Sequence, residues 1–196
     1  MVWAKLWSTL PGNEVSVLKP PAEYRTDRLV LRAAHPSDAP ALQKALRVSR
    51  EDFFPWLSFS AKESDLQTLD KVSRLGAESF HNDEFYVWRV WSTDGVMVGS
   101  VDLHSIDRSV PCCEIGYWVR SDYAGQGYAR EFVQAALRIA QRDLKMLRVE
   151  ARCDVRNARS WRLAERLGFR FEGTATNDSR DAAGDLTSTR IYALTA

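Results

Sequence analysis

The chain has 196 residues, of which 45% are hydrophobic, 11% aromatic and 27% charged. These proportions are typical of one globular domain with a buried core, and they exclude the disordered and fibrous classes of protein. The 27 lysine and arginine residues nearly balance the 26 acidic residues, for a formal net charge of +1, so the overall charge gives no reason to expect a nucleic acid or an anionic membrane as a partner.

The first part of the chain, residues 1–23, shows no sustained hydrophobic period and contains three prolines. We expect it to be an extension that precedes one domain at residues 24–196. Its Trp3 and Trp7, with Trp56 further along the chain, favour a contact surface. Such a surface suits either a peptide substrate or a second copy of the chain in a homodimer.

Hydrophobic spacing predicts a strand and two helices at the start of this domain. Leu29 and Leu31 alternate with their neighbours as they would in a strand. Ser37 is a suitable N-cap for a helix whose apolar face includes Leu42 and Leu46. A second helix is predicted over 66–80, where apolar side chains recur at helical spacing.

The other elements follow from the same kinds of pattern. A turn at Thr93-Asp94-Gly95 joins two predicted strands, and the stretch 176–185 is predicted to be a loop. The predicted strands are 85–91, 96–103, 112–119, 149–153, 169–173 and 188–194, and the predicted helices are 132–140 and 157–167. The order β, α, α, β, β, β, α, β, α, β, β indicates a single domain of the α/β (α+β) class, with a mixed, mostly antiparallel sheet flanked by about four helices.

Two further classes of feature are not expected in this chain. No apolar run approaches the roughly 18 to 20 residues that cross a bilayer, and the N-terminus lacks the order of a secretory signal, so we expect a cytoplasmic protein without membrane contact. The three cysteines, Cys112, Cys113 and Cys153, cannot all pair with one another, which argues against a disulfide framework. Without Cys-x-x-Cys or clustered histidines, no metal site is expected.

The sharpest local signal is the turn Gly125-Gln126-Gly127-Tyr128-Ala129, between a predicted strand and a predicted helix. Glycines let backbone amides approach a ligand, and the start of a helix presents free N–H groups and a positive dipole end. The turn therefore indicates an anion site, most naturally for a pyrophosphate, with an ordinary tight connection as the alternative. Arg130 stands where a dinucleotide fingerprint needs its third glycine.

A second signal is Asn157-Ala158-Arg159-Ser160, at the start of the last predicted helix. Asn157 is most simply a helix N-cap, and Ser160 is a capping or solvated hydroxyl. The helix is expected to end at Gly168, in the left-handed conformation that closes many helices.

Taken together, these segments resemble the GNAT superfamily of acyl-CoA-dependent N-acetyltransferases, and more closely its RimJ/RimL group, which acetylates the N-termini of ribosomal proteins. The resemblance covers residues 24–194. It lies in four segments: the opening strand from Thr26 to Arg32, the central strand from Glu114 to Val119, the turn from Gly125 to Ala129, and Asn157-x-x-Ser160 through Phe169. One position departs, since Ala124 stands where the signature Gln/Arg-x-x-Gly-x-Gly/Ala has Gln or Arg. We expect this change to weaken the match without abolishing binding.

The resemblance implies acetyl-CoA as the cosubstrate and no metal. It also implies a splayed pair of parallel strands, ending near Val119 and Asp154, with the pantetheine arm between them. One backbone N–H there would polarise the thioester carbonyl. The residues expected to bind the cofactor are Trp118, Val119 and Arg120 through main-chain groups, Gly125, Gln126, Gly127, Tyr128, Ala129 and Arg130 around the pyrophosphate, and Asn157 at the pantetheine amide.

The reaction needs two proton transfers, of which the resemblance assigns the one to the thiolate, while the base is chosen by its place on the central strand. Ser160 takes the place of the donor that stabilises the departing thiolate, since this helix has no tyrosine. Glu114 is the first candidate for the base that deprotonates the amine, with a simple ion-paired strand carboxylate as the equal alternative. The reserve candidates are Glu150, Asp102 and His104.

The acceptor is expected to be a primary amine. Likeness to the RimJ/RimL group favours the N-terminal α-amine of a protein such as a ribosomal protein, while a polyamine, an amino acid or an antibiotic stays open. A CoA-binding sensor or scaffold without turnover is the alternative from a different class. The segment from Phe53 to Trp56 is expected either to line the acceptor channel or to form a separate hydrophobic cluster under a loop.

Overall fold

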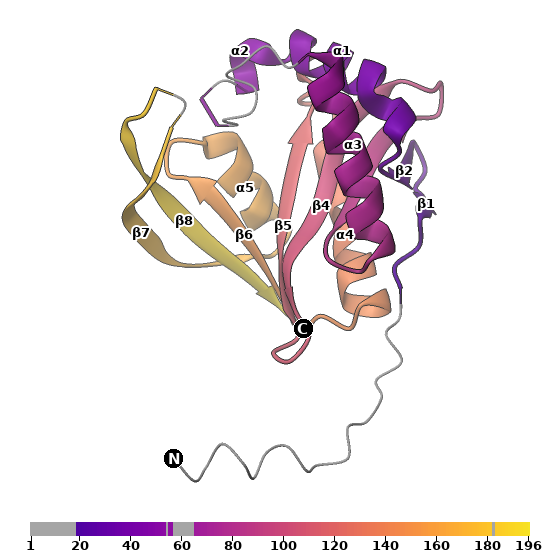
Figure 1. Cartoon of the computed structure of the whole chain (residues 1–196). Coiled ribbons are helices and arrows are strands. Elements are labelled where there is room, and N and C mark those ends of the chain that lie inside the picture. Colours follow the sequence, from indigo (N-terminus) through magenta and orange to yellow (C-terminus); the bar gives the residue numbers. More distant parts are fainter. Residues whose placement is uncertain (1–18, 54, 57–64, 182) are drawn as a thin grey trace, which may run out of the picture.

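One mixed sheet organises the chain (Figure 1). The computed structural model describes residues 19–53, 55–56, 65–181 and 183–196, and within them the sheet has eight strands in the order β1-β2-β3-β4-β5-β6-β8-β7. Their bounds are β1 Glu23–Arg25, β2 Leu29–Ala33, β3 Tyr86–Ser92, β4 Met97–Asp107, β5 Cys112–Val119, β6 Arg148–Asp154, β7 Arg170–Arg180 and β8 Leu186–Thr195. All neighbouring strands are antiparallel except β5 and β6.

Helices cover both faces of this sheet. They are α1 Ala39–Val48, α2 Arg50–Phe53, α3 Leu66–His81, α4 Tyr128–Arg138 and α5 Ala158–Arg166, and α4 continues into a π-helical turn, Ile139–Asp143. The first three form one apolar cluster with the sheet, around Phe53 and Leu69, whereas α4 and α5 form a larger cluster on the opposite face, around Phe132 and Trp88. Within the described ranges, no helix is long and apolar enough to span a membrane.

The parallel pair β5–β6 is short. It joins Cys112 to Arg148 and ends where Glu114 meets Glu150, after three residue pairs. Beyond that point β5 continues only with β4, up to Val119, and β6 continues only with β8, up to Asp154. The two strands therefore separate toward their carboxyl ends. The mixed sheet and the splayed parallel pair confirm the expected fold class.

The predicted N-cap at Ser37 is wrong. Residues Pro36–Asp38 form a 3-10 turn that is capped by His35, and α1 begins only after it. Asp38 is buried, accepts a hydrogen bond from the His35 amide at 2.8 Å and pairs with Arg32. The carboxylate with an arginine partner, rather than the serine hydroxyl, fixes this helix start.

The predicted loop at 176–185 is also wrong over much of its length. Strand β7 runs on to Arg180, and only the turn around Asp181–Asp185 separates it from β8. A register irregularity between Ala175 and Ser179 accommodates Asn177 at a φ of 54°. The loop interpretation failed because this part of β7 is exposed on both faces, so no apolar alternation marks it as a strand.

The N-terminal edge of the sheet adds one unpredicted element. Strand β1 pairs Glu23 with Arg32 of β2, just before the position where the apolar alternation begins. Residues 1–18 of the expected extension, with Trp3 and Trp7, lie outside the described residues.

Candidate active site

The glycine turn lies where β5 ends and α4 begins. Gly125 and Gly127 have φ angles of 76° and 82°, in the left-handed region that favours glycine. The first hydrogen bond of the helix runs from the Glu131 amide to the Gly127 carbonyl at 3.1 Å, and no side chain caps this helix start in the described part of the chain. The amides of residues 128–130 therefore precede the first helical bond and are available to an anion.

Arg28, at the start of β2, braces this turn. Its guanidinium donates to the Gln126 carbonyl at 3.2 Å, lies 4.4 Å over the Tyr128 ring and pairs with Glu131 at 2.6 Å. Desolvation opposes the charge on Glu131, but hydrogen bonds from Thr26 and Arg28 outweigh it and lower the pKa of this carboxyl. Arg28 thus ties β2 to the turn and to α4, a contact that no spacing in the sequence revealed.

At the end of β5, some main-chain peptide groups face β4 and others face the gap beside β6. The Arg120 amide donates to the Val98 carbonyl of β4 at 2.9 Å. Because successive residues of a strand point their peptide groups to opposite sides, Val119 directs its own toward the gap beside β6. Among Trp118, Val119 and Arg120, Val119 is thus the residue whose backbone is available to a ligand in the gap.

Two sets of main-chain groups are thus available here: the amides of residues 128–130 and the backbone of Val119. The pyrophosphate of CoA would fit the amides, and its amide-bearing arm would fit the Val119 backbone.

Ser160 lies in the first turn of α5, facing the same side of the sheet as α4. Asn157 is the N-cap of this helix, as the simplest interpretation predicted: its carboxamide oxygen accepts from the Ser160 amide at 3.2 Å. The Ser160 hydroxyl lies 3.2 Å from the hydroxyl of Tyr117 on β5, and Tyr117 also donates to the Ser160 carbonyl at 3.1 Å. No spacing in the sequence connects Tyr117 with Ser160, since the two lie 43 residues apart.

On the opposite face, Glu114 belongs to a small polar cluster with two of its reserve candidates. His104 Nδ1 is 2.7 Å from Asp102, and His104 Nε2 is 3.7 Å from Glu114. Gly116 makes room for this arrangement, since a Cβ there would lie 2.7 Å from the Asp102 carboxylate. The hydrogen bond to Asp102 raises the pKa of His104, against the effect of burial, and the charges of Asp102 and Glu114 act in the same direction.

Glu150, the remaining reserve candidate for the base, pairs with Arg148 and is not part of this cluster. Arg148 holds the Glu150 carboxylate at 2.7 Å and extends to Glu172 as well. Glu150 is thus an ion-paired strand carboxylate, although it lies opposite Glu114 in the register.

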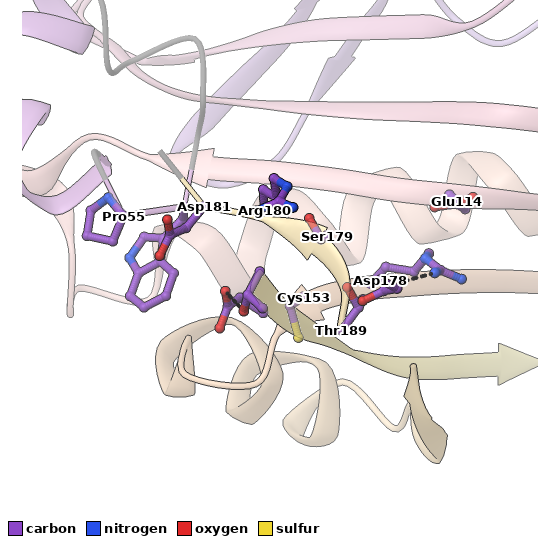
Figure 2. Close-up of a pocket in the computed structure, with 12 residues that line it drawn as sticks. Pro55, Glu114, Cys153, Asp178, Ser179, Arg180, Asp181 and Thr189 are labelled. Atoms are coloured by element: carbon purple, nitrogen blue, oxygen red, sulfur yellow. Dashed lines mark hydrogen bonds and ion pairs between the residues drawn. The ribbon is translucent and has the colours of Figure 1, made fainter. Parts of the chain in front are cut away.

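A half-open cavity of about 420 Å³ lies over the Glu114 end of this face. Figure 2 shows Glu114 on β5 at one end and Pro55 at the other, with the β7–β8 hairpin between them. The lining residues are Pro55, Trp56, Glu114, Arg152, Cys153, Asp154, Asp178, Ser179, Arg180, Asp181, Thr187 and Thr189. Four of these are carboxylates and two are guanidinium groups. Asp178 pairs with Arg152, and Asp154 and Asp181 pair with Arg156, so among the described residues Glu114 is the lining carboxylate without an arginine partner.

Arg156 ties three walls of this cavity together. Its guanidinium contacts Asp154 at the end of β6 at 2.8 Å and Asp181 in the hairpin turn at 3.1 Å, and it lies 5.9 Å over the Trp56 ring. Burial opposes the charge on Asp154, but hydrogen bonds from Arg156 and Thr187 lower its pKa to about 2. Both carboxylates therefore stay charged and keep the hairpin close to β6.

The segment from Phe53 to Trp56 was expected either to line the acceptor channel or to form a hydrophobic cluster, and its residues differ in this respect. Phe53 is buried and packs edge-on against Trp118, with ring centroids 5.4 Å apart, so it belongs to a hydrophobic cluster. Trp56 lines the cavity. Phe54 lies outside the described residues.

Comparison with known proteins identifies the family and the fold to which this chain is similar. The family described as "Acetyltransferase (GNAT) domain" matches residues 28–170. The chain is 31% identical over 160 residues to the [Ribosomal protein uS5]-alanine N-acetyltransferase of Escherichia coli (strain K12), covering 80% of this chain and 82% of that protein.

Solved structures with the same fold include two whose ligands are stated. The RimL ribosomal L7/L12 α-N-protein acetyltransferase in complex with coenzyme A has a TM-score of 0.81 at 22% identity, covering 89% of this chain and 96% of that one. The microcin C7 self-immunity acetyltransferase MccE in complex with acetyl-CoA and AMP has a TM-score of 0.82 at 19% identity, covering 92% and 99%.

Proposed function

The chain belongs to the GNAT acetyltransferase family and is an acetyl-CoA-dependent N-acetyltransferase, and we propose that its acceptor is the α-amine at the N-terminus of a protein, of the ribosomal-protein class. The observation that carries this proposal is the cavity next to the gap between β5 and β6, in which Glu114 is the carboxylate without an arginine partner among the described residues. The acceptor of the uS5-alanine N-acetyltransferase supports it. Ribosomal proteins are made in the cytoplasm, so the proposal places this chain there too.

In the proposed mechanism the two substrates meet in the gap. Acetyl-CoA supplies an acyl group activated as a thioester. The amides of residues 128–130 and the backbone of Val119 bind it, and the Asn157 NH₂ group, which has no partner in the described part of the chain, is left to bind an amide of the same ligand. Glu114, which no arginine neutralises in the described part of the chain, attracts the ammonium form of the acceptor.

Glu114 is the proposed base. It takes a proton from the ammonium group, directly or through water, so that the amine can attack. His104, bonded to Asp102 and facing Glu114, can hold that proton next. Ser160, on the opposite face, donates a hydrogen bond to the sulfur as it becomes a thiolate.

The Glu114→Gln variant tests the base. Gln cannot accept a proton, so we expect activity to fall most at neutral pH, where the acceptor is mostly protonated, and to recover partly as the buffer itself deprotonates the amine. The measurement is kcat/KM from about pH 6 to about pH 10. Glu150→Gln is the control, because Arg148 already binds that carboxylate. A constant ratio of variant to native rate over this range would exclude Glu114 and leave His104 and Asp102.

The Trp56→Ala variant tests the acceptor cavity. Trp56 lines the cavity and packs near Arg156, whereas the glycine turn is built by other elements. We expect KM for a peptide acceptor to rise roughly 5- to 30-fold, as for the loss of a contact worth about 1–2 kcal/mol, with KM for acetyl-CoA near native. Phe171→Ala, at a half-exposed aromatic of β7, is the control. Equal peptide KM values in both variants would remove Trp56 from the acceptor site.

The acceptor class is tested by thiol release from acetyl-CoA with matched peptides. One peptide carries a free α-amine and a blocked lysine, and the other a blocked α-amine and a free lysine. We expect turnover only with the first. Turnover with a polyamine alone would overturn the protein acceptor, and tight CoA binding without turnover on any amine would favour a sensor.

A further inference from the structure

Tyr117 is a buried tyrosine whose hydroxyl contacts the proposed thiolate donor twice. It donates to the Ser160 carbonyl at 3.1 Å, and its oxygen lies 3.2 Å from Ser160 Oγ. Tyr117 lies on β5 just before Val119, at the edge of the gap where β5 and β6 have already separated. It thus links the strand that borders the gap to the helix that carries Ser160.

We infer that Tyr117 is a positioning residue for Ser160, and that its hydroxyl fixes the Ser160 hydroxyl so that Ser160 can donate to the sulfur of CoA in the gap. The inference rests on the proposed function of Ser160 as the thiolate partner. It explains how a donor can be provided here although α5 carries no tyrosine.

The hydrogen-bond geometry supports this role. A phenol has one proton to give, and the Ser160 carbonyl can accept it. The phenol can instead donate that proton to Ser160 Oγ, 3.2 Å away. This bond fixes the serine oxygen and leaves the serine's own proton for another acceptor. When Ser160 donates to a thiolate, Tyr117 can turn its proton to Ser160 Oγ and compensate the oxygen, with no net proton transfer from the protein.

The surroundings keep Tyr117 neutral. Burial raises its pKa to about 12, although the hydrogen bond with Ser160 opposes this. The titratable group that acts on Tyr117 is Cys153 on β6, which hydrogen-bonds with Ser160 and whose thiol pKa burial raises to about 11. The charged groups that act on Cys153 are Arg190 on β8, Asp154 on β6 and Glu165 on α5. At neutral pH, therefore, phenol and thiol are both protonated, and Tyr117 stays a donor.

A double-mutant cycle tests the coupling. Ser160→Ala, Tyr117→Phe and the double variant are compared in kcat and in KM for acetyl-CoA with a peptide acceptor. We expect Tyr117→Phe to lower kcat by roughly 5- to 30-fold, as for one lost hydrogen bond, with KM for acetyl-CoA unchanged. Because Tyr117 acts through Ser160, the double variant should be no slower than Ser160→Ala alone. Effects that multiply would overturn the inference.

A control variant separates positioning from general damage to the core. Tyr86 is also buried, also has a pKa raised to about 12, and hydrogen-bonds with Asp83 and Arg108 away from the gap. Tyr86→Phe removes an equivalent hydroxyl and should leave kcat near native. A loss of kcat in Tyr86→Phe equal to that in Tyr117→Phe would also overturn the inference.

A second readout needs no acceptor. The affinity for CoA itself is measured against pH, because a site that stabilises the thiolate binds CoA more tightly as its thiol ionises. We expect this rise in the native protein and in Tyr86→Phe, and a smaller one in both Tyr117→Phe and Ser160→Ala. A full rise in Tyr117→Phe would overturn the inference. If the CoA readout behaves as expected while no peptide α-amine is acetylated, the proposed acceptor fails and the role of Tyr117 stands.

Discussion

Gly127→Val is expected to lower the affinity for acetyl-CoA by at least about 100-fold. The φ of Gly127 is 82°, so a side chain there strains the backbone by roughly 1–2 kcal/mol and relocates the amides that begin α4. Two lost hydrogen bonds to a charged phosphate would cost about 3–6 kcal/mol together, which corresponds to a factor of at least about 100. Isothermal titration with CoA measures the loss directly.

Gly95→Val is the matched control for this prediction. Gly95 has a φ of 81° in the β3–β4 turn, and a Cβ there would meet nothing within 4 Å. A valine at this position causes the same backbone strain as one at Gly127, but the position is not in the proposed site. The melting temperature of the Gly95→Val protein should therefore fall by a similar amount, while its affinity for CoA stays native. A folded Gly127→Val protein that binds CoA as the native chain does would show that the pyrophosphate lies elsewhere.

Ser160→Ala is expected to lower kcat by roughly 10- to 1000-fold, with KM for acetyl-CoA near native. The Asn157 cap uses the backbone amide of Ser160, so the helix start survives the substitution. What is lost is the hydroxyl, which contacts Tyr117 on one side and is left to stabilise sulfur on the other. An interaction made mainly as the thiolate forms affects kcat rather than binding.

Steady-state kinetics with the peptide acceptor check this result. Ser37→Ala removes an exposed hydroxyl from the turn before α1 and should be silent. A variant at Ser160 that keeps native kcat would remove this residue from the mechanism and would make Tyr117 the first alternative donor.

Part of the sheet could be predicted because burial on one face imposes alternation. In β2 the side chains of Leu29 and Leu31 are fully buried and alternate with the partly buried Val30 and Arg32, and that pattern is visible in the sequence. The outer part of β7 has no buried face, and therefore it looked like a loop. The pattern marks a strand only where the strand has something to bury.

The candidate site was predictable wherever local geometry demanded particular residues. The left-handed turn at Gly125 and Gly127 and the cap at Asn157 are such positions. Contacts made by tertiary packing were not: Arg28 reaches Gln126 across 98 residues, and no pattern along the chain connects them. Asp102, His104 and Glu114 were each named from the sequence, but their association depends on the pairing of β4 with β5.

Because β5 and β6 separate after Glu114 and Glu150, the sheet has an opening that connects its two faces. Glu114 lies on one face and Ser160 on the other, and Cys153, beside Ser160, also lines the cavity over Glu114. In the proposed arrangement the acyl donor and the amine therefore reach the opening from opposite faces of the sheet. Both can be bound at the same time, in a ternary complex. Double-reciprocal plots of rate against one substrate, at several fixed concentrations of the other, should therefore intersect. A single inhibitor that mimics both substrates would have to extend through the opening in the sheet.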